Sequence, residues 1–319
     1  MVADGQVTPL QQVMACVMYG SVSISITLFN KAIFAVYKFQ YPNVVTLLQI
    51  LISIVYIKIL GVTGHMKLAP FSWKTVQLLL PMTFFWWIYV FSGVTALNYL
   101  NVPMFSVLRR STSLVVVGIN YVLYRTFPSM NSLSALLVMA AGAIVAGMSD
   151  MTYNSVGYFW TFVCIFSTAA YLTAIKWSKE RSGVGEHDLL MYNNLIALPF
   201  MATYLYFGTS ELDTVWEYPR LHDPGFQLFL LLSISQAFLL NVCIFYCTTV
   251  NSPLATTVTG QLKDLLMTSL GMVLFGDVIY NPVNIMGLCV GLGGGMWYSY
   301  IGYRKSVEAS SAKSKDSDV

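Results

Sequence analysis

Long apolar runs dominate the chain, and Pro, Gly, Asn and charged residues interrupt them. A helix needs about 20 apolar residues to cross the ~30 Å hydrocarbon core of a membrane. By this criterion the runs predict ten membrane-spanning helices. These lie near residues 10–36, 41–62, 75–98, 103–124, 131–149, 154–178, 187–209, 225–248, 252–276 and 280–303. The sequence therefore predicts an all-α membrane protein.

The composition supports this class. Of the 319 residues, 56% are hydrophobic and 10% are charged, whereas a soluble chain carries about 25% charged residues. This excludes a disordered protein, a nucleic-acid-binding domain and an ordinary cytosolic enzyme. The net charge of +3 is too small to indicate a polyanionic partner, and the five cysteines lack the spacing of a metal site. We expect a lipid bilayer as partner, and no nucleic acid, metal or cofactor.

Lysine and arginine test the number of spans, because they concentrate in cytosolic loops. With both termini in the cytosol, ten spans leave only Lys38 and Arg220 in the loops on the opposite side. The cytosolic side receives Lys58, Lys67, Lys74, Arg125, Lys176, Lys179, Arg181, Arg304, Lys305, Lys313 and Lys315. An odd number of spans would destroy this asymmetry. We therefore expect both termini to be cytosolic, with residues 304–319 forming a disordered tail.

A weak internal repeat divides the chain into halves. Asn101-Val102-Pro103 opens the fourth span, and Asn251-Ser252-Pro253 opens the ninth at an offset of 150 residues. Such short matches also arise by chance. If the repeat is real, its second copy is inverted, because a unit of five spans is odd, and inverted repeats are common in secondary transporters. We expect a first five-helix repeat in residues 1–150 and a second, inverted one in residues 151–303.

Charges inside the predicted spans are candidates for function, because a charge at the bilayer centre costs about 2.5–3.5 kcal/mol on insertion scales. Lys31 follows Asn30 in the first span and either serves a binding site or extends to the interface. Arg109 and Arg110 lie about two turns into the fourth span. Adjacent helical residues point about 100° apart. We expect one arginine to face a cavity and the other to reach a carbonyl or the interface.

Two more charges, Lys263 and Asp264, lie near the middle of the ninth span. They share one helical face with Gly260. One interpretation makes Lys263 a phosphate-binding cation, with Asp264 orienting basic side chains and Gly260 leaving room for a ribose or a sugar. The alternative is a Lys–Asp pair that neutralises itself and has a structural purpose.

The seventh span carries Tyr192, Asn193 and Asn194. Two amides and a phenol are costly in hydrocarbon unless they find partners. They suit the edge of a nucleobase, with the tyrosine ring as a stacking surface, and the alternative is that they bond neighbouring helices. Apart from Asp264, the predicted spans hold basic side chains and scarcely any carboxylate. This bias favours an anionic solute such as a phosphate or diphosphate ester.

Five motifs together give the chain a family resemblance. They are Leu28-Phe29-Asn30-Lys31-Ala32, Tyr41-Pro42-Asn43, Val102-Pro103-Met104-Phe105-Ser106-Val107-Leu108-Arg109-Arg110, Tyr192-Asn193-Asn194 and Gly260-Gln261-Leu262-Lys263-Asp264. Through them, most of residues 20–303 resembles the nucleotide-sugar transporters of the solute carrier 35 group, within the drug/metabolite transporter superfamily.

This resemblance implies ten helices, both termini in the cytosol and residence in the Golgi or endoplasmic-reticulum membrane. It also implies an antiporter, not an enzyme, that exchanges a cytosolic nucleotide sugar for the lumenal nucleoside monophosphate by alternating access. We expect the substrate to be bound by Asn30, Lys31, Arg109, Arg110, Tyr192, Asn193, Asn194, Gly260, Lys263 and Asp264. A homodimer is compatible with the sequence.

The motifs favour a UDP-sugar as substrate. Transporters of GDP-mannose carry Phe-Tyr-Asn-Asn in span seven and Gly-Ala-Leu-Asn-Lys in span nine. Here the first motif is nearly matched, with Met191 in place of the phenylalanine, and this implies base contact by Asn193 and Asn194. The second motif differs, because the lysine stands one place earlier, at Lys263, and Asp264 holds its usual position. Spans four and nine resemble the branch that carries UDP-N-acetylglucosamine. The alternatives are a transporter of GDP-mannose or GDP-fucose and a membrane glycosyl- or phosphotransferase.

Overall fold

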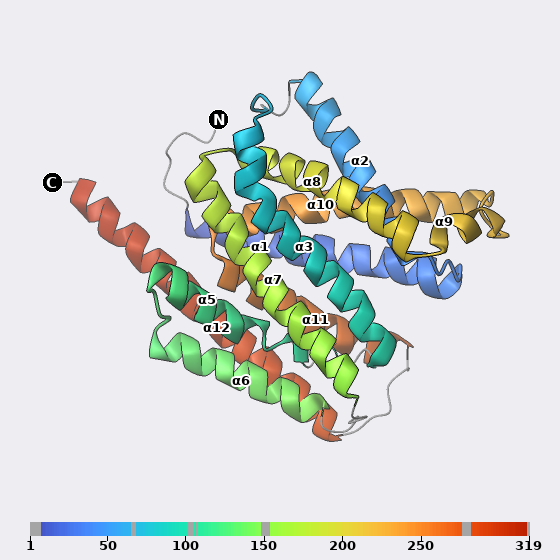
Figure 1. Cartoon of the computed structure of the whole chain (residues 1–319). Helices are drawn as coiled ribbons and strands as arrows, with labels where there is room; N and C mark the ends of the chain where they lie inside the picture. Colours follow the sequence, from blue (N-terminus) through green and yellow to red (C-terminus); the bar gives the residue numbers. More distant parts are fainter. Residues whose placement is uncertain are drawn as a thin grey trace. The chain divides into compact units, whose positions relative to one another are not determined.

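The computed structural model describes residues 8–64, 68–100, 105, 108–147, 154–275 and 282–317. Within these ranges every regular element is a helix (Figure 1). The long helices are α1 (Pro9–Lys31), α2 (Pro42–Val62), α3 (Trp73–Tyr99), α5 (Thr112–Tyr124), α6 (Met130–Gly147), α7 (Ser155–Ser182), α8 (Glu186–Gly208), α10 (Pro224–Val250), α11 (Pro253–Phe275) and α12 (Pro282–Ser317). The predicted all-α class is confirmed, and each predicted range overlaps one of these helices.

Three short elements complete the described helices. A π-helical turn, η1 (Ala32–Val36), continues the chain directly after α1. Between α8 and α10 lie α9 (Glu211–Thr214) and the 3-10 turn η3 (Val215–Glu217).

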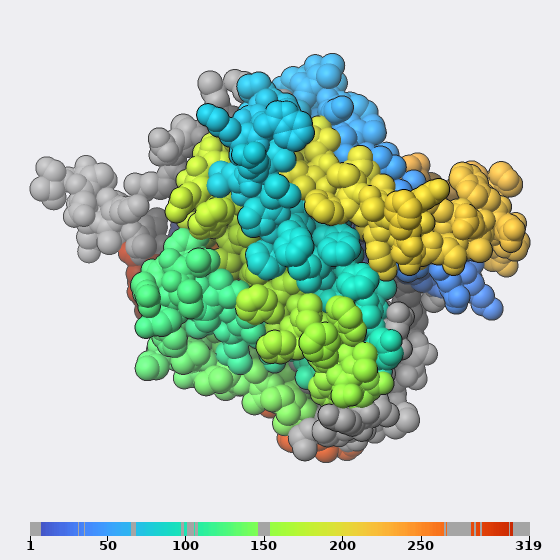
Figure 2. Space-filling view, in the orientation of Figure 1, coloured from blue at the N-terminus to red at the C-terminus, as the bar shows by residue number. Residues whose placement is uncertain are grey.

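Within the described ranges, five helices are long and apolar enough to cross a membrane. These are Pro9–Phe34, Pro42–Val62, Trp73–Ala96, Ser155–Ser182 and Pro224–Val250. Many large apolar side chains on these helices are exposed, among them Trp73 and Phe84 of α3. In the space-filling view, α3 lies on the surface turned toward the viewer (Figure 2). Outward apolar side chains suit contact with lipid, as expected for a membrane protein.

Proline marks the start of five long helices. The first residues of α1, α2, α10, α11 and α12 are Pro9, Pro42, Pro224, Pro253 and Pro282. Proline suits the first position of a helix, because its missing N–H would have no partner there and its fixed φ is already helical. For this reason the proline positions in the sequence locate helix starts closely.

The helices form two compact units. The first unit consists of Met1–Gly20, Ile88–Thr173 and Val250–Val319. The second unit consists of Ser21–Trp87 and Ala174–Thr249. Each unit thus draws on both halves of the sequence. These units are clusters of helices in space. The boundary expected near residue 150 separates two repeats of the sequence, so the two divisions differ.

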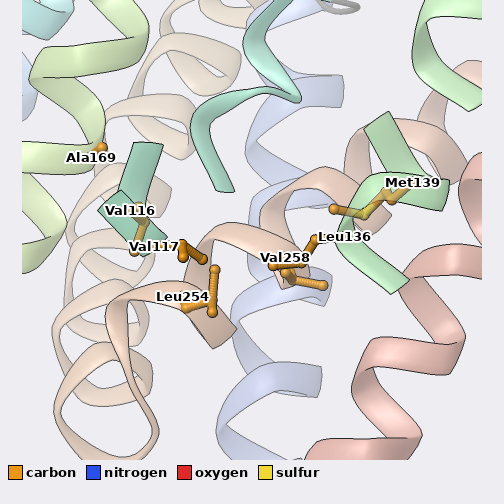
Figure 3. Packing of buried hydrophobic residues seen from close by; sticks show 7 residues of the cluster. All are labelled: Val116, Val117, Leu136, Met139, Ala169, Leu254 and Val258. Carbon is orange, nitrogen blue, oxygen red and sulfur yellow. The ribbon is translucent and has the colours of Figure 1, made fainter. Parts of the chain in front are cut away.

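An apolar cluster holds α5 and α11 together in the first unit. Val116 and Val117 of α5 meet Leu254 and Val258 of α11, and Leu136, Met139 and Ala169 complete the cluster (Figure 3). Each of these side chains is nearly or fully buried. The cluster therefore holds α5 against α11. The charged residues of the fourth and ninth predicted spans lie close to it in sequence.

Glycines allow α12 to pack closely against α6 in the same unit (Figure 1). A Cβ atom added at Gly142 would lie 2.4 Å from the backbone nitrogen of Gly291 and 2.7 Å from the carbonyl oxygen of Gly287. A Cβ at Gly294 would lie 2.7 Å from the backbone nitrogen of Met139. Small residues at helix contacts let backbones approach in this way. The glycine-rich end of the last span therefore serves close helix packing.

Helix α12 continues to Ser317, past the end of the tenth predicted span. Ala, Glu, Lys and Arg are good helix formers, and Arg304 pairs with Glu308 one turn later at 2.9 Å. Lys305 Nζ also donates a hydrogen bond to Ser129 Oγ at 3.0 Å. These local contacts favour continuation of the helix.

In the second unit, Glu211 caps the start of α2. Its carboxylate accepts hydrogen bonds from the backbone N–H groups of Asn43 and Val44, each at 3.0 Å. Tyr41 donates its hydroxyl hydrogen to the carbonyl oxygen of Thr214 at 3.1 Å. A carboxylate at this position satisfies N–H groups that lack intrahelical partners and opposes the helix dipole. The motif Tyr41-Pro42-Asn43 therefore fixes the start of α2.

We predict that Gly142→Ala destabilises the protein by about 1–3 kcal/mol, because the new methyl group must displace the backbone of α12. Gly293→Ala is the matched control, since nothing lies within 4 Å of a Cβ added there. Thermal unfolding of the purified variants measures both effects. Equal melting temperatures for the two variants would contradict glycine-dependent packing of α6 on α12.

Candidate functional site

Arg110 is the most deeply buried basic side chain among the predicted site residues whose side chains the structure describes. It lies just before α5 and is 3% exposed. Its carbonyl oxygen accepts hydrogen bonds from Gln261 Nε2 at 2.7 Å and Ser113 Oγ at 3.1 Å. Its Nε and Nη1 have no hydrogen-bond partner within the described ranges. A buried guanidinium with unpaired nitrogens is costly, and charged N–H donors of this kind suit the oxygen atoms of a phosphate.

Arg109 has different surroundings from its neighbour. Its guanidinium lies over the ring of Phe105, 5.6 Å from the ring centroid, and the side chain is half-buried. This contact has the geometry of a cation–π interaction. The two arginines therefore have different surroundings, and Arg110 is the more deeply buried of the two.

Lys263 and Asp264 form a local ion pair. Lys263 Nζ lies 2.5 Å from Asp264 Oδ1, and the lysine side chain is 16% exposed. This is the self-neutralising arrangement that the sequence left open. Asp264 is also close enough to act electrostatically on both Arg109 and Arg110. We call these four residues the cationic group, which carries two positive charges in excess because Lys263 and Asp264 cancel.

Gly260 lies against a tyrosine. A Cβ atom added at Gly260 would lie 3.0 Å from the hydroxyl oxygen of Tyr19 of α1. The sequence analysis expected open space for a ribose or a sugar here. The structure instead places the Tyr19 hydroxyl beside the glycine, which adds a polar group to the surroundings of α11.

In the second unit, Asn193 and Asn194 of α8 are each 2% exposed. Asn193 Oδ1 accepts a hydrogen bond from Thr83 Oγ1 at 3.2 Å. Asn194 Nδ2 is buried and has no hydrogen-bond partner in the described part of the chain. We call Thr83, Asn193 and Asn194 the amide group. Asn194 therefore has amide hydrogens left to donate to another group.

Tyr192 anchors the loop that precedes α3. Its hydroxyl oxygen accepts a hydrogen bond from the backbone N–H of Ser72 at 2.8 Å, and its ring stacks on Phe71 at 5.8 Å. The neighbouring Asp188 Oδ1 accepts a hydrogen bond from the N–H of Ala69 at 2.8 Å. The hydroxyl and the ring of Tyr192 thus both contact the loop. This placement favours a structural role for Tyr192 over the expected base contact.

Asn30 and Lys31 end α1, directly before the π-helical turn. Asn30 Oδ1 accepts a hydrogen bond from Ser233 Oγ of α10 at 2.5 Å. This bond joins two helices of the second unit, a known use of polar side chains in membranes. The side chain of Lys31 lies outside the described part of the structure.

Comparison with known proteins assigns the chain to a family. A model of the Triose-phosphate Transporter family matches residues 10–299, which is most of the chain. The protein belongs to the triose-phosphate transporter family. Membership confirms the expected class of membrane transporter, as opposed to an enzyme, and confirms the resemblance at the level of the family.

Individual members of the family are named for nucleotide-sugar transport. The chain is 31% identical to the UDP-N-acetylglucosamine transporter UGNT1 of Arabidopsis thaliana, over 90% of this chain and 86% of the relative. It is 30% identical to the UDP-galactose/UDP-glucose transporter 7 of Arabidopsis thaliana, over 95% of this chain and 94% of the relative. It is 26% identical to the GDP-fucose transporter 1 of Dictyostelium discoideum, over 88% of this chain and 78% of the relative.

A solved crystal structure has the same fold. It superposes with a TM-score of 0.67 at 13% sequence identity, covering 92% of this chain and 98% of the other. At this sequence identity the superposition shows a shared fold and gives no information about the substrate of this protein.

Two residues of this family member were missed by the sequence analysis. Thr83 is the one polar residue in the apolar run from Leu78 to Trp87 of α3. Gln261 is the second residue. It is an amide in the middle of a predicted span, and it was not among the expected site residues. An uncharged polar residue in a membrane span also needs a hydrogen-bond partner, so it is a candidate for a binding site in the same way as a charged residue.

We predict that Tyr192→Phe lowers stability by about 1 kcal/mol, because the N–H of Ser72 loses its acceptor. Nucleotide affinity should stay within twofold of wild type. Tyr206→Phe is the matched control on the same helix, since Tyr206 is 70% exposed. Thermal unfolding and calorimetric titration with UMP measure the two quantities, and a tenfold loss of affinity at unchanged stability would instead indicate a base contact.

Proposed function

We propose that the protein carries a nucleotide sugar across a membrane, with a UDP-sugar as the favoured substrate. The observation that carries the proposal is the buried Arg110, a residue that is 3% exposed and whose Nε and Nη1 are unpaired within the part of the chain that the structure describes. Arginine binds phosphate oxygens with a rigid fork of donors that stays charged at every physiological pH. The names of the relatives supply the nucleotide-sugar class.

The charge of the cationic group matches this substrate. Its excess of two positive charges comes from Arg109 and Arg110, because Lys263 is neutralised by Asp264. A nucleotide sugar carries two ionised phosphate groups, and a nucleoside monophosphate carries a similar charge. In a low-dielectric span these anions compensate cations that water cannot reach. Arg110 is the phosphate ligand in this proposal, and Lys263 and Asp264 adjust the local charge.

The amide group is the candidate for recognition of the base. Asn193 and Asn194 offer amide hydrogens, which suit the carbonyl oxygens of uracil. The carbonyl oxygen of guanine suits them as well, and one relative is named for GDP-fucose. A transporter of GDP-mannose or GDP-fucose is therefore the second candidate. Lys31 stays a candidate for the phosphates on the grounds of its sequence position alone.

The proposed mechanism is alternating access with obligatory exchange for a nucleoside monophosphate. An empty carrier would have to change conformation with a buried guanidinium unpaired, which costs free energy, whereas a loaded carrier would not. Ten spans arranged as two inverted repeats suit this mechanism. In support, the second unit combines Ser21–Trp87 with Ala174–Thr249, which occupy similar places in the two halves of the sequence.

The proposed location is the Golgi membrane, with the endoplasmic reticulum as the alternative and both termini in the cytosol. The family resemblance of the sequence implies these compartments. The asymmetry of Lys and Arg between the two sides of the predicted spans supports the orientation. A homodimer is a further proposal that rests on the sequence alone.

The test is uptake of labelled UDP-N-acetylglucosamine into proteoliposomes that contain the purified protein and are preloaded with UMP, GMP or no nucleotide. We predict fast uptake only with internal UMP, because UMP supplies both the anion that the empty carrier lacks and the uracil that the amide group is proposed to recognise. Equal uptake under all three conditions would contradict exchange. The control is the same protein in liposomes preloaded with inorganic sulfate at equal ionic strength.

The same assay separates the alternatives. Faster uptake with internal GMP and labelled GDP-fucose would favour a GDP-sugar transporter. Release of UMP or UDP from the labelled substrate, without accumulation inside the vesicles, would favour a transferase.

A further inference from the structure

Gln261 of α11 is a buried amide that is only half satisfied. Gln261 is 6% exposed to solvent. Its Nε2 donates a hydrogen bond to the carbonyl oxygen of Arg110 at 2.7 Å. Its Oε1 is buried and has no hydrogen-bond partner over the described ranges. Buried polar atoms are nearly always satisfied, so an unpaired one requires an explanation.

The unpaired atom of Gln261 must be the acceptor. The two ends of an amide differ in chemistry, and the carbonyl oxygen of Arg110 can only accept a hydrogen bond. The nitrogen of Gln261 must therefore face Arg110, and the oxygen must face away from that carbonyl. A rotated amide would bring two oxygens together, so the orientation is fixed by chemistry. The group that completes Gln261 is a donor.

The location of Gln261 indicates which donor this is. The amide lies against the main chain of Arg110, whose Nε and Nη1 also lack partners in the described structure. A single ligand that satisfies both residues must combine an anion with a hydroxyl or N–H group. A nucleotide has this combination, because its ribose hydroxyls lie a few bonds from the phosphate.

A neutral acceptor suits this position better than a carboxylate. A carboxylate beside Arg110 would neutralise the guanidinium and repel a phosphate. Asp264 is paired with Lys263, and the side-chain amide that contacts the main chain of Arg110 is uncharged. Glutamine can accept a hydroxyl hydrogen and leave the positive charge of Arg110 available.

We propose that Gln261 is a substrate-binding residue whose Oε1 accepts a hydrogen bond from a ribose hydroxyl of the nucleotide. The proposal rests on the proposed function, in which Arg110 binds the phosphate. The ribose is shared by the nucleotide sugar and the nucleoside monophosphate. A contact to it therefore serves both substrates of an exchange, whereas a contact to the sugar would serve one.

The test compares wild type with Gln261→Met, which keeps the length of the side chain and removes both polar atoms. Calorimetric titration of the purified full-length protein measures Kd for UMP, for 2′,3′-dideoxy-UMP and for UDP-N-acetylglucosamine. We expect wild type to bind dideoxy-UMP about tenfold more weakly than UMP, as is typical for the loss of one buried hydrogen bond. Gln261→Met should bind UMP and UDP-N-acetylglucosamine about tenfold more weakly than wild type and should no longer distinguish UMP from dideoxy-UMP.

Gln227→Met is the matched control. Gln227 also donates its amide hydrogen to a carbonyl oxygen, that of Leu221 at 3.1 Å, but it is exposed. Its Kd for UMP should stay within twofold of wild type. This control separates the loss of an amide in general from the loss of the buried one.

Several outcomes would overturn the proposal. They are a Kd of Gln261→Met for UMP within twofold of wild type, a loss confined to UDP-N-acetylglucosamine, and unchanged discrimination against dideoxy-UMP. If Gln261→Met does not fold, equal affinity of wild type for UMP and dideoxy-UMP overturns it without a variant. Failure of wild type to bind any of the three nucleotides would instead overturn the proposed function.

Discussion

A buried positive charge without a partner is the constraint on which this account depends. The guanidinium of Arg110 is almost fully removed from solvent, and two of its nitrogens are unpaired within the described residues. A protein that only needed stability would place an apolar side chain there. The surrounding structure holds the arginine in place, through the amide of Gln261 on its carbonyl oxygen and the apolar cluster between α5 and α11. An anion bound at Arg110 would pair with these nitrogens and would explain why the arginine is buried there.

The division of labour among the basic residues follows from their partners. Lys263 is neutralised by the adjacent Asp264, and Arg109 lies over the ring of Phe105. Arg110 has two buried nitrogens, Nε and Nη1, without a hydrogen-bond partner among the described residues. Sequence position made all three equal candidates, because insertion cost depends on charge and depth and not on partners. Only the packing of the fold distinguishes a cation that is already compensated from one that is not.

The fold was largely predictable and the site only partly so. Apolar runs and prolines located the helices, because both reflect local constraints on the chain. The apolar runs did not locate the end of α12, which continues past Arg304 through good helix formers and a pair of opposite charges one turn apart. Tyr192 was expected to bind a base, but the loop at Ser72 uses its hydroxyl. A contact between residues so far apart in sequence leaves no local pattern, and the same is true of Thr83 and Asn193.

The most direct test of the central claim is thermal unfolding of purified full-length wild type and Arg110→Met, each with and without UMP. Without nucleotide, the variant should melt at the same temperature as wild type or higher, because an apolar chain replaces an unpaired buried charge. UMP should raise the melting temperature of wild type and leave that of the variant unchanged. A variant that melts at a lower temperature than wild type and still gains the same stabilisation from UMP would contradict the account.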